Sequence, residues 1–260
     1  MTRDRPRARP REGPREGPRD WDATTYDSLT LPHEQWGRGV LDRLRLTGDE
    51  VVLDAGCGTG RDAAALRGRW PDVRLVALDG SQQMLDVART RLGDKRVSYV
   101  HADLMEPLPV DEPVDAVMSV AAFHWVPDHE RLLAHLAAVM RSGARLVSDC
   151  GGRGNVADVT RAIASVTGEA PSDWEFADDV ATRSRLEAAG FDVEDVRLRV
   201  DPFRCDDPAV LETYLATVVL GSHLDELPVD EHEAFVREVR VALSAPVVDY
   251  VRLEIEAVRR

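Results

Sequence analysis

The sequence is poor in several features that mark whole classes of protein. Lys95 is its only lysine, and the net charge is −14. Binding to DNA or RNA phosphates needs a basic surface, so no nucleic-acid partner is expected. The three cysteines, Cys57, Cys150 and Cys205, lie far apart and form no C-x-x-C pair, which predicts neither a metal site nor a disulfide framework. No apolar run approaches the roughly 18 residues of a membrane span, and no signal-peptide core is present, so we predict a cytoplasmic protein with no membrane partner.

Residues 1–20 differ from the rest of the chain. Prolines recur at positions 6, 10, 14 and 18, the tetrapeptide REGP is repeated, and seven arginines face four acidic residues. Such a segment blocks helices and strands and has no apolar face to bury, so a disordered Arg/Pro-rich tail is predicted. A basic arm that binds RNA or an acidic partner is the alternative. The tail carries a charge of +3, which leaves the remaining body near −17.

From residue 21 onward the sequence predicts one globular domain with an elaboration. Residues 21–48 read as an N-terminal helical cap, with Trp36, Val40, Leu41 and Leu44 at helical spacing. Apolar strands then alternate with amphipathic helices, which predicts a doubly wound α/β domain with a mostly parallel sheet. The expected strands are 50–55, 73–79, 97–103, 114–123 and 144–150, and the expected helices are 60–70, 82–92 and 128–141.

The last third of the chain follows another order. A helix at 178–189 and a strand at 191–200 are followed by helical stretches at 208–221 and 230–244, and only then by a final strand at 247–258. This order predicts a Rossmann-like core formed by 50–200 and 247–260, interrupted by a helical insertion at 205–246. Such an insertion suits a lid or a substrate-selecting element. A packing or dimerisation element is the other interpretation, and both a monomer and a homodimer stay open.

Residues 51–60, VVLDAGCGTG, form the most informative motif. Glycines at 56, 58 and 60 let the backbone turn sharply and approach a ligand, and Asp79 ends the next apolar strand, where a carboxylate can accept two ribose hydroxyls. A dinucleotide site uses G-x-G-x-x-G, whereas the spacing here is G-x-G-x-G. Asp54, two residues before the first glycine, would repel a pyrophosphate but suits a ligand with an ammonium or sulfonium charge.

This motif resembles the first motif of the class I S-adenosylmethionine (SAM) dependent methyltransferases almost letter for letter. The resemblance implies SAM as cofactor and a sheet whose last strand is antiparallel. It also implies that the loop of Asp54, Gly56, Cys57 and Gly58 meets the methionine and ribose of SAM, that Asp79 holds the ribose hydroxyls, and that Gly80 and Met84 pack near the adenine. Asp103 and Leu104, in an A-D-L segment, would bind the adenine, and Ala121 would lie beside the sulfonium.

A narrower resemblance connects the chain to the trans-aconitate 2-methyltransferase group. It rests on WDATTYDSL, QQMLDVARTRL, FHWVPDHERLL, LATVVLGSHLDELP and YVRLEI, and these segments span nearly the whole chain after residue 20. The resemblance implies methylation of a carboxylate oxygen of a small acid. Such an acceptor is ionised at neutral pH, so in-line positioning and exclusion of water matter more than a general base.

Candidate acceptor residues follow from position and type. His124, after the strand at 114–123, is a candidate general base, a neutral donor to a carboxylate, or a core histidine. Arginines would bind the non-reacting carboxylates of a polyacid, whereas apolar and aromatic side chains would indicate a natural product methylated at oxygen or carbon. The further acceptor candidates are Trp21, Tyr26, His33, Trp36, Trp125 and Arg153, with Arg204 and His223 as additional polar groups.

Two other classes of protein compete with a small-molecule methyltransferase. A nicotinamide oxidoreductase would need a better glycine fingerprint, and the sequence has no catalytic Tyr-x-x-x-Lys. A non-catalytic SAM-binding protein would share the glycine motif but lack turnover.

Overall fold

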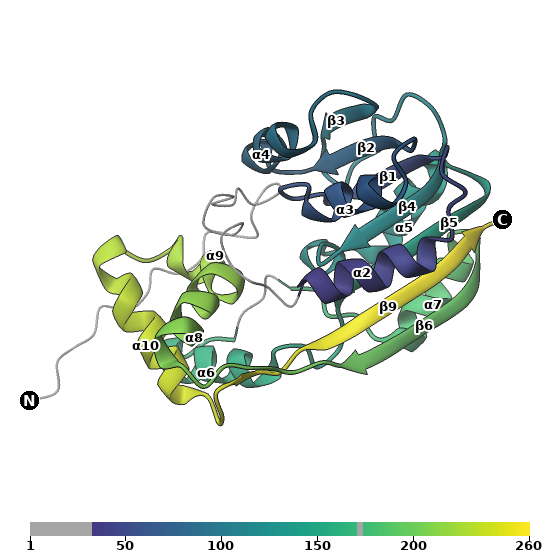
Figure 1. The fold of residues 1–260 in the computed structure, drawn as a ribbon. Helices are drawn as coiled ribbons and strands as arrows, with labels where there is room; N and C mark the ends of the chain where they lie inside the picture. Colours follow the sequence, from purple (N-terminus) through teal and green to yellow (C-terminus); the bar gives the residue numbers. More distant parts are fainter. Residues whose placement is uncertain (1–32, 171–173) are drawn as a thin grey trace, which may run out of the picture.

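Seven strands form the central sheet of the computed structural model, which describes residues 33–170 and 174–260 (Figure 1). The strand order is β3-β2-β1-β4-β5-β9-β6, and β9 runs antiparallel to both of its neighbours while the pairs from β3 to β5 are parallel. This arrangement confirms the predicted mostly parallel α/β sheet with an antiparallel last strand. The strands are β1 Val51–Ala55, β2 Arg74–Asp79, β3 Val97–His101, β4 Val114–Val120, β5 Met140–Gly151, β6 Phe191–Val200 and β9 Val251–Arg259.

Helices cover both faces of the sheet. The helices on one face are α2 His33–Leu44, α3 Arg61–Arg69 and α4 Gln82–Leu92, and those on the other are α5 His129–Val139 and α7 Asp179–Ala188 (Figure 1). Side chains of alternating orientation along each strand supply two separate apolar cores. Ser81 caps α4, because its hydroxyl accepts from the Met84 N–H at 3.3 Å. None of the described helices is long and apolar enough to cross a bilayer.

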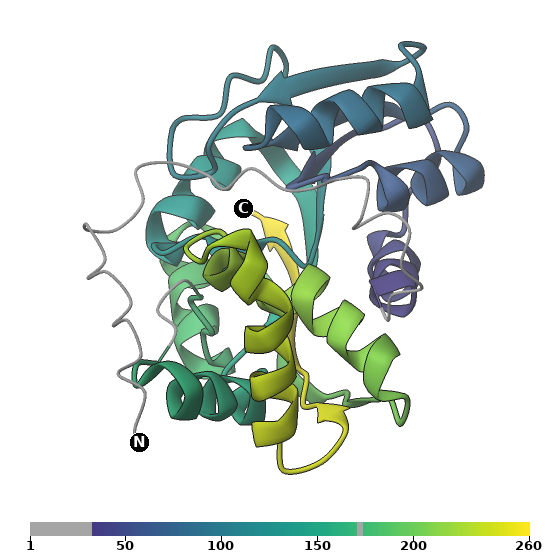
Figure 2. The ribbon, with the colours of Figure 1, turned by 90° about the vertical axis from the view of Figure 1, so that its left-hand side faces the viewer.

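The insertion lies between β6 and β9 and forms a third apolar core with α6 and Trp36. Its helices gather at the end of the sheet toward which the parallel strands point, and they stand in front of the sheet when seen from that side (Figures 1 and 2). Helix α6 spans Ala157–Thr167, before β6. The insertion itself contains α8 Pro208–Tyr214, a π-helical turn Leu215–Val219, α9 Gly221–Leu224, a 3-10 turn Val229–Glu231 and α10 His232–Ala242.

The structure differs from the sequence prediction around this insertion. Helix α6 was not predicted, and the final strand begins at Val251 rather than at 247. Residues 247–248 instead form β8, which pairs with β7, Phe203–Arg204. The two residues between β8 and β9 are tied to the insertion side: the Asp249 carboxylate accepts from the Asp158 N–H at 2.9 Å, and the Tyr250 hydroxyl lies 2.6 Å from that of Tyr214.

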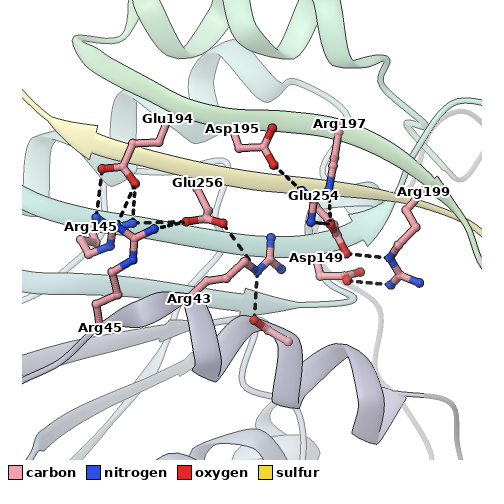
Figure 3. Close-up of polar contacts among 11 residues, drawn as sticks. Arg43, Arg45, Arg145, Asp149, Glu194, Asp195, Arg197, Arg199, Glu254 and Glu256 are labelled. Carbon is pink, nitrogen blue, oxygen red and sulfur yellow. Dashed lines mark hydrogen bonds and ion pairs between the residues drawn. The ribbon is translucent and has the colours of Figure 1, made fainter.

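Ion pairs connect side chains on one face of the sheet where β5, β9 and β6 lie side by side (Figure 3). Glu254 accepts from the Nε atoms of Arg197 and Arg199, both at 2.7 Å. Glu256, two residues along β9, pairs with Arg145 of β5 at 3.3 Å. Burial raises the pKa of Glu254, but the bonds from Arg199 and Arg197 outweigh this and hold the pKa below its ordinary value. The outer part of this sheet face is therefore held by paired charges.

Candidate functional site

The loop after β1 is shaped by its glycines. Gly56, Gly58 and Gly60 have φ values of 80°, 52° and 74°, in the left-handed region that side chains disfavour. A Cβ on Gly56 would lie closer to the Cβ of Ala122 than the 3.0 Å that real Cβ atoms keep, whereas a Cβ on Gly58 would meet nothing within 4 Å. The first glycine thus lets the loop contact the segment after β4, and the second leaves the surface of the loop open.

Asp79 fastens this loop to the end of β2. Its Oδ2 accepts from the Gly58 N–H at 2.8 Å, and its Oδ1 accepts from the Ser81 N–H at 2.9 Å. Burial raises the pKa of Asp79, while these backbone bonds act in the opposite direction. Because each carboxylate oxygen can accept more than one hydrogen bond, both keep capacity for the hydroxyls of a ribose.

Asp54 is a buried carboxylate near other acids. Its side chain is 2% exposed, and its Oδ2 has no hydrogen-bond partner among the described residues. Burial and the neighbouring charges of Asp62 and Asp79 raise its pKa well above the ordinary value. A buried acid without a cation is costly, so this atom fits the positively charged methionine portion of SAM.

The remaining predicted cofactor residues lie around the same strand ends. The Oδ1 of Asp103 accepts from the Met105 N–H at 2.8 Å, Leu104 and Met84 are buried, and the Gly80 carbonyl lies 2.9 Å from Nε2 of His101. Burial and the charges of Asp54 and Asp79 raise the pKa of the Cys57 thiol well above its usual value, which disfavours the reactive thiolate form. No described cluster of three His, Cys, Asp or Glu side chains could hold a metal ion.

The segment after β4 is strained and fixed from two sides. Ala121 has a φ of 55°, which costs energy for any residue with a Cβ, and its N–H donates to the Asp149 carbonyl of β5 at 2.8 Å. Arg252 of β9 donates to the same carbonyl at 3.2 Å and to Oδ1 of Asp149 at 2.7 Å. The residue predicted to lie beside the sulfonium is therefore positioned by a buried ion pair.

His124 lies in the short turn Phe123–Trp125 and is 8% exposed. Its Nδ1 accepts from the Gly151 N–H at 3.2 Å, and its carbonyl accepts from the Glu175 N–H at 2.9 Å. With Nδ1 as acceptor, the proton of the neutral ring is on Nε2. The histidine is thus held as a donor at Nε2, which favours the orienting role over the role of general base.

Four rings form a closed group that we call the aromatic wall: His124, Trp125, Trp174 and Phe176. The centroid distances are 5.3 Å for His124–Trp125, 6.1 Å for Trp125–Trp174, 5.5 Å for Trp174–Phe176 and 5.9 Å for Phe176–His124. Trp174 and Phe176 were not predicted from the sequence. The alternation W-E-F was the available signal, because a period of two in an extended segment places both rings on the same side.

Two other predicted acceptor residues, Trp36 and Arg153, have partners outside the aromatic wall. Trp36 is 1% exposed in the third core, its Nε1 donates to Asp201 at 2.6 Å, and the Arg252 guanidinium lies 3.6 Å from its ring centroid. Arg153 is exposed and pairs with Asp178 at the start of α7. His33 is the first residue of α2, and Trp21 and Tyr26 lie outside the described residues.

Residues 52–143 match the family model of a methyltransferase domain. Trans-aconitate 2-methyltransferase of Azoarcus sp. (strain BH72) is 36% identical over 126 residues, 48% of this chain and 49% of that protein. The enzyme of the same name from Escherichia coli O7:K1 is 32% identical over 123 residues, 47% of this chain and 48% of that protein. The chain thus matches about half the length of these curated relatives, a narrower span than the sequence motifs predicted.

Solved structures share the fold. A putative methyltransferase from Bacillus halodurans superposes with a TM-score of 0.61 and 21% identity, over 86% of this chain and 98% of that one. Geranyl diphosphate C-methyltransferase from Streptomyces coelicolor, solved with S-adenosyl-L-homocysteine, superposes with a TM-score of 0.58 and 16% identity, over 91% of this chain and 82% of that one. Residues 52–143 therefore match a methyltransferase domain, the chain shares its fold with solved methyltransferase structures, and it resembles the trans-aconitate 2-methyltransferases over about half of their length.

Proposed function

We propose that the protein transfers a methyl group from SAM to a carboxylate oxygen of a small acid. The observation that carries the SAM assignment is the buried Asp54, whose Oδ2 has no partner among the described residues beside a loop held open by glycine. A dinucleotide would place its pyrophosphate near this carboxylate, which disfavours the nicotinamide alternative. The relatives named trans-aconitate 2-methyltransferase support an acid as acceptor.

We assign separate roles to SAM and to the residues around it. SAM, when bound, supplies an electrophilic methyl group. The acceptor oxygen forms the new O–C bond as the S–C bond breaks, the electron pair stays on sulfur, and no proton has to be removed from an acid that is ionised at pH 7. Asp54 and Asp79 hold the cofactor, and His124, fixed as a donor by Gly151, orients the acceptor.

The helical insertion would shield this reaction from water. Val120 and Ala121, at the end of β4, pack against the apolar core that the insertion forms with α6. A lid built on this contact would cover the position beside the sulfonium, where exclusion of water strengthens electrostatic interactions.

Transfer of labelled methyl from SAM to a panel of small carboxylic acids tests the proposal. The expected product is a base-labile methyl ester, formed in proportion to enzyme. Tight binding of SAM without transfer to any acid would contradict the acceptor and favour the non-catalytic SAM-binding protein, and failure to bind SAM would refute the cofactor assignment as well.

A further inference from the structure

The aromatic wall depends on a glycine at position 151. An ideal Cβ on Gly151 would lie 2.7 Å from Cε1 of Phe176, so only glycine lets this ring lie against the end of β5. The same glycine holds His124 through its N–H, and the backbone of Glu175, between the other two rings, holds the carbonyl of His124. One strand end therefore positions rings from two segments that are far apart in the sequence.

The wall adjoins the position predicted for the reactive methyl group. His124 and Trp125 follow Ala121 and Ala122 after one intervening residue, and Trp174 and Phe176 pack against the same core as Ala121. Trp125, Trp174 and Phe176 are half-buried. The neighbouring Phe123 is 1% exposed and belongs to the core between the sheet and helices α5 and α7. Three of the four rings thus keep surface that a bound molecule can cover.

Among the described residues, Arg153, Arg199 and Arg252 lie near this end of β5, and each is paired with a carboxylate. Arg252 is 1% exposed and bound to Asp149, and Arg153 is exposed and paired with Asp178. A polycarboxylate would need converging cations for its non-reacting groups, and a body with a charge near −17 repels additional negative charge. Half-buried rings instead favour a planar, apolar ligand that stacks on them.

We infer that the acceptor is a monocarboxylic acid with an aromatic or conjugated apolar body, and that Phe176 and Trp174 determine this specificity. The inference rests on the proposed function and names its substrate class. The body of the acid lies against the aromatic wall, and the single carboxylate is the reacting group near His124. A tricarboxylate such as trans-aconitate is then a poor ligand.

The test compares two probes that share a conjugated trans double bond bearing a carboxylate. Trans-cinnamate carries a phenyl ring, and trans-aconitate carries further carboxylates. Each acid is titrated into the protein saturated with S-adenosylhomocysteine, and binding is followed by calorimetry together with methyl transfer from SAM. We expect cinnamate to bind at least about tenfold more tightly, because stacking contributes affinity that extra carboxylates do not. Equal or tighter binding of trans-aconitate overturns the inference.

Variants separate this inference from the proposed function. Phe176→Leu and Gly151→Ala should each raise the KM for cinnamate about tenfold while the affinity for SAM stays unchanged, and Arg153→Ala should change neither. Loss of SAM binding in Phe176→Leu, or loss of acid binding in Arg153→Ala, contradicts the assignment. Binding of cinnamate without methyl transfer refutes the proposed reaction and leaves the specificity of the aromatic wall supported.

Discussion

In the site that we propose, the ends of β1 and β2 supply a cofactor half and the ends of β4 and β5 supply an acceptor half, with different chemical groups in each. The cofactor half, formed by Asp54, residues 56–60 and Asp79, uses backbone N–H groups and carboxylates. The acceptor half, formed by Ala121 and the aromatic wall, uses rings and a buried ion pair. The cofactor half suits a charged, hydroxyl-rich ligand, and the acceptor half suits a flat and apolar one. In the proposed function, this difference separates the binding of the cofactor from the selection of the acceptor.

The largest expected effect comes from removing the ion pair that supports the acceptor half. Arg252→Met removes the guanidinium that donates to the buried carboxylate of Asp149 at 2.7 Å and leaves the more distant Arg199 at 3.6 Å, and we expect a loss of about 3–5 kcal/mol in the free energy of unfolding. Burial already raises the pKa of Asp149 above its ordinary value despite Arg252. Without the arginine the pKa rises further, so the loss of stability grows as the pH increases from acid to neutral. Urea unfolding at several pH values measures this.

Arg197→Met is the matched control for that variant. The Arg197 guanidinium pairs with Glu254 of β9, but the Arg197 side chain is 55% exposed. We therefore expect the free energy of unfolding to fall by no more than about 1 kcal/mol. Equal losses for the two variants would show that burial does not distinguish the two ion pairs.

The next effect concerns the cofactor half alone. Asp79→Ala removes the acceptor of the Gly58 and Ser81 N–H groups together with the expected ribose contacts. We expect SAM to bind about 100-fold more weakly, roughly 3 kcal/mol for two charge-assisted hydrogen bonds. Calorimetric titration checks this, with Asp86→Ala on the exposed side of α4 as control. A change below about threefold in Asp79→Ala would refute the role of this carboxylate.

A third variant tests the contact between the two halves. Gly56→Ala introduces a methyl group against Ala122, whereas Gly168, with a similar φ of 86° in the left-handed region, has open space around it. Gly168→Ala should cost about 1 kcal/mol from the backbone alone, and Gly56→Ala at least twice that. The double variant Gly56→Ala/Ala122→Gly should recover the excess in thermal unfolding. Additive effects in this cycle would mean that the two segments do not press on each other.

The smallest expected effect is that of Arg153→Ala. The Arg153 side chain is 70% exposed and pairs with Asp178, so kcat/KM for the methyl acceptor should stay within about twofold and Tm should not change. A large loss of activity with any polyacid would instead place this arginine in the acceptor half.

Predictability from sequence differed between the halves for a physical reason. The cofactor half is local: Gly58 and Asp79 are 21 residues apart, and each residue follows a strand end that periodicity reveals. The acceptor half depends on contacts over longer distances, such as the 103 residues between Asp149 and Arg252. Trp36 illustrates the limit, since its ring was predicted to line the acceptor and lies in the core, where its position depends on Asp201 and Tyr250.

Titration of SAM into the wild-type protein and Asp54→Asn at pH 5 and pH 7 tests whether the Asp54 carboxylate receives the cation of SAM. The raised pKa of Asp54 means that the ligand-free protein loses stability as pH rises above the ordinary value of 3.8, so the asparagine variant should be more stable without ligand, by a few degrees in Tm for about 1 kcal/mol. We predict that the variant binds SAM more weakly, and that the difference is larger at pH 7, where the wild-type carboxylate carries more charge. Unchanged affinity in Asp54→Asn at both pH values would contradict the claim that this carboxylate receives the cation of SAM.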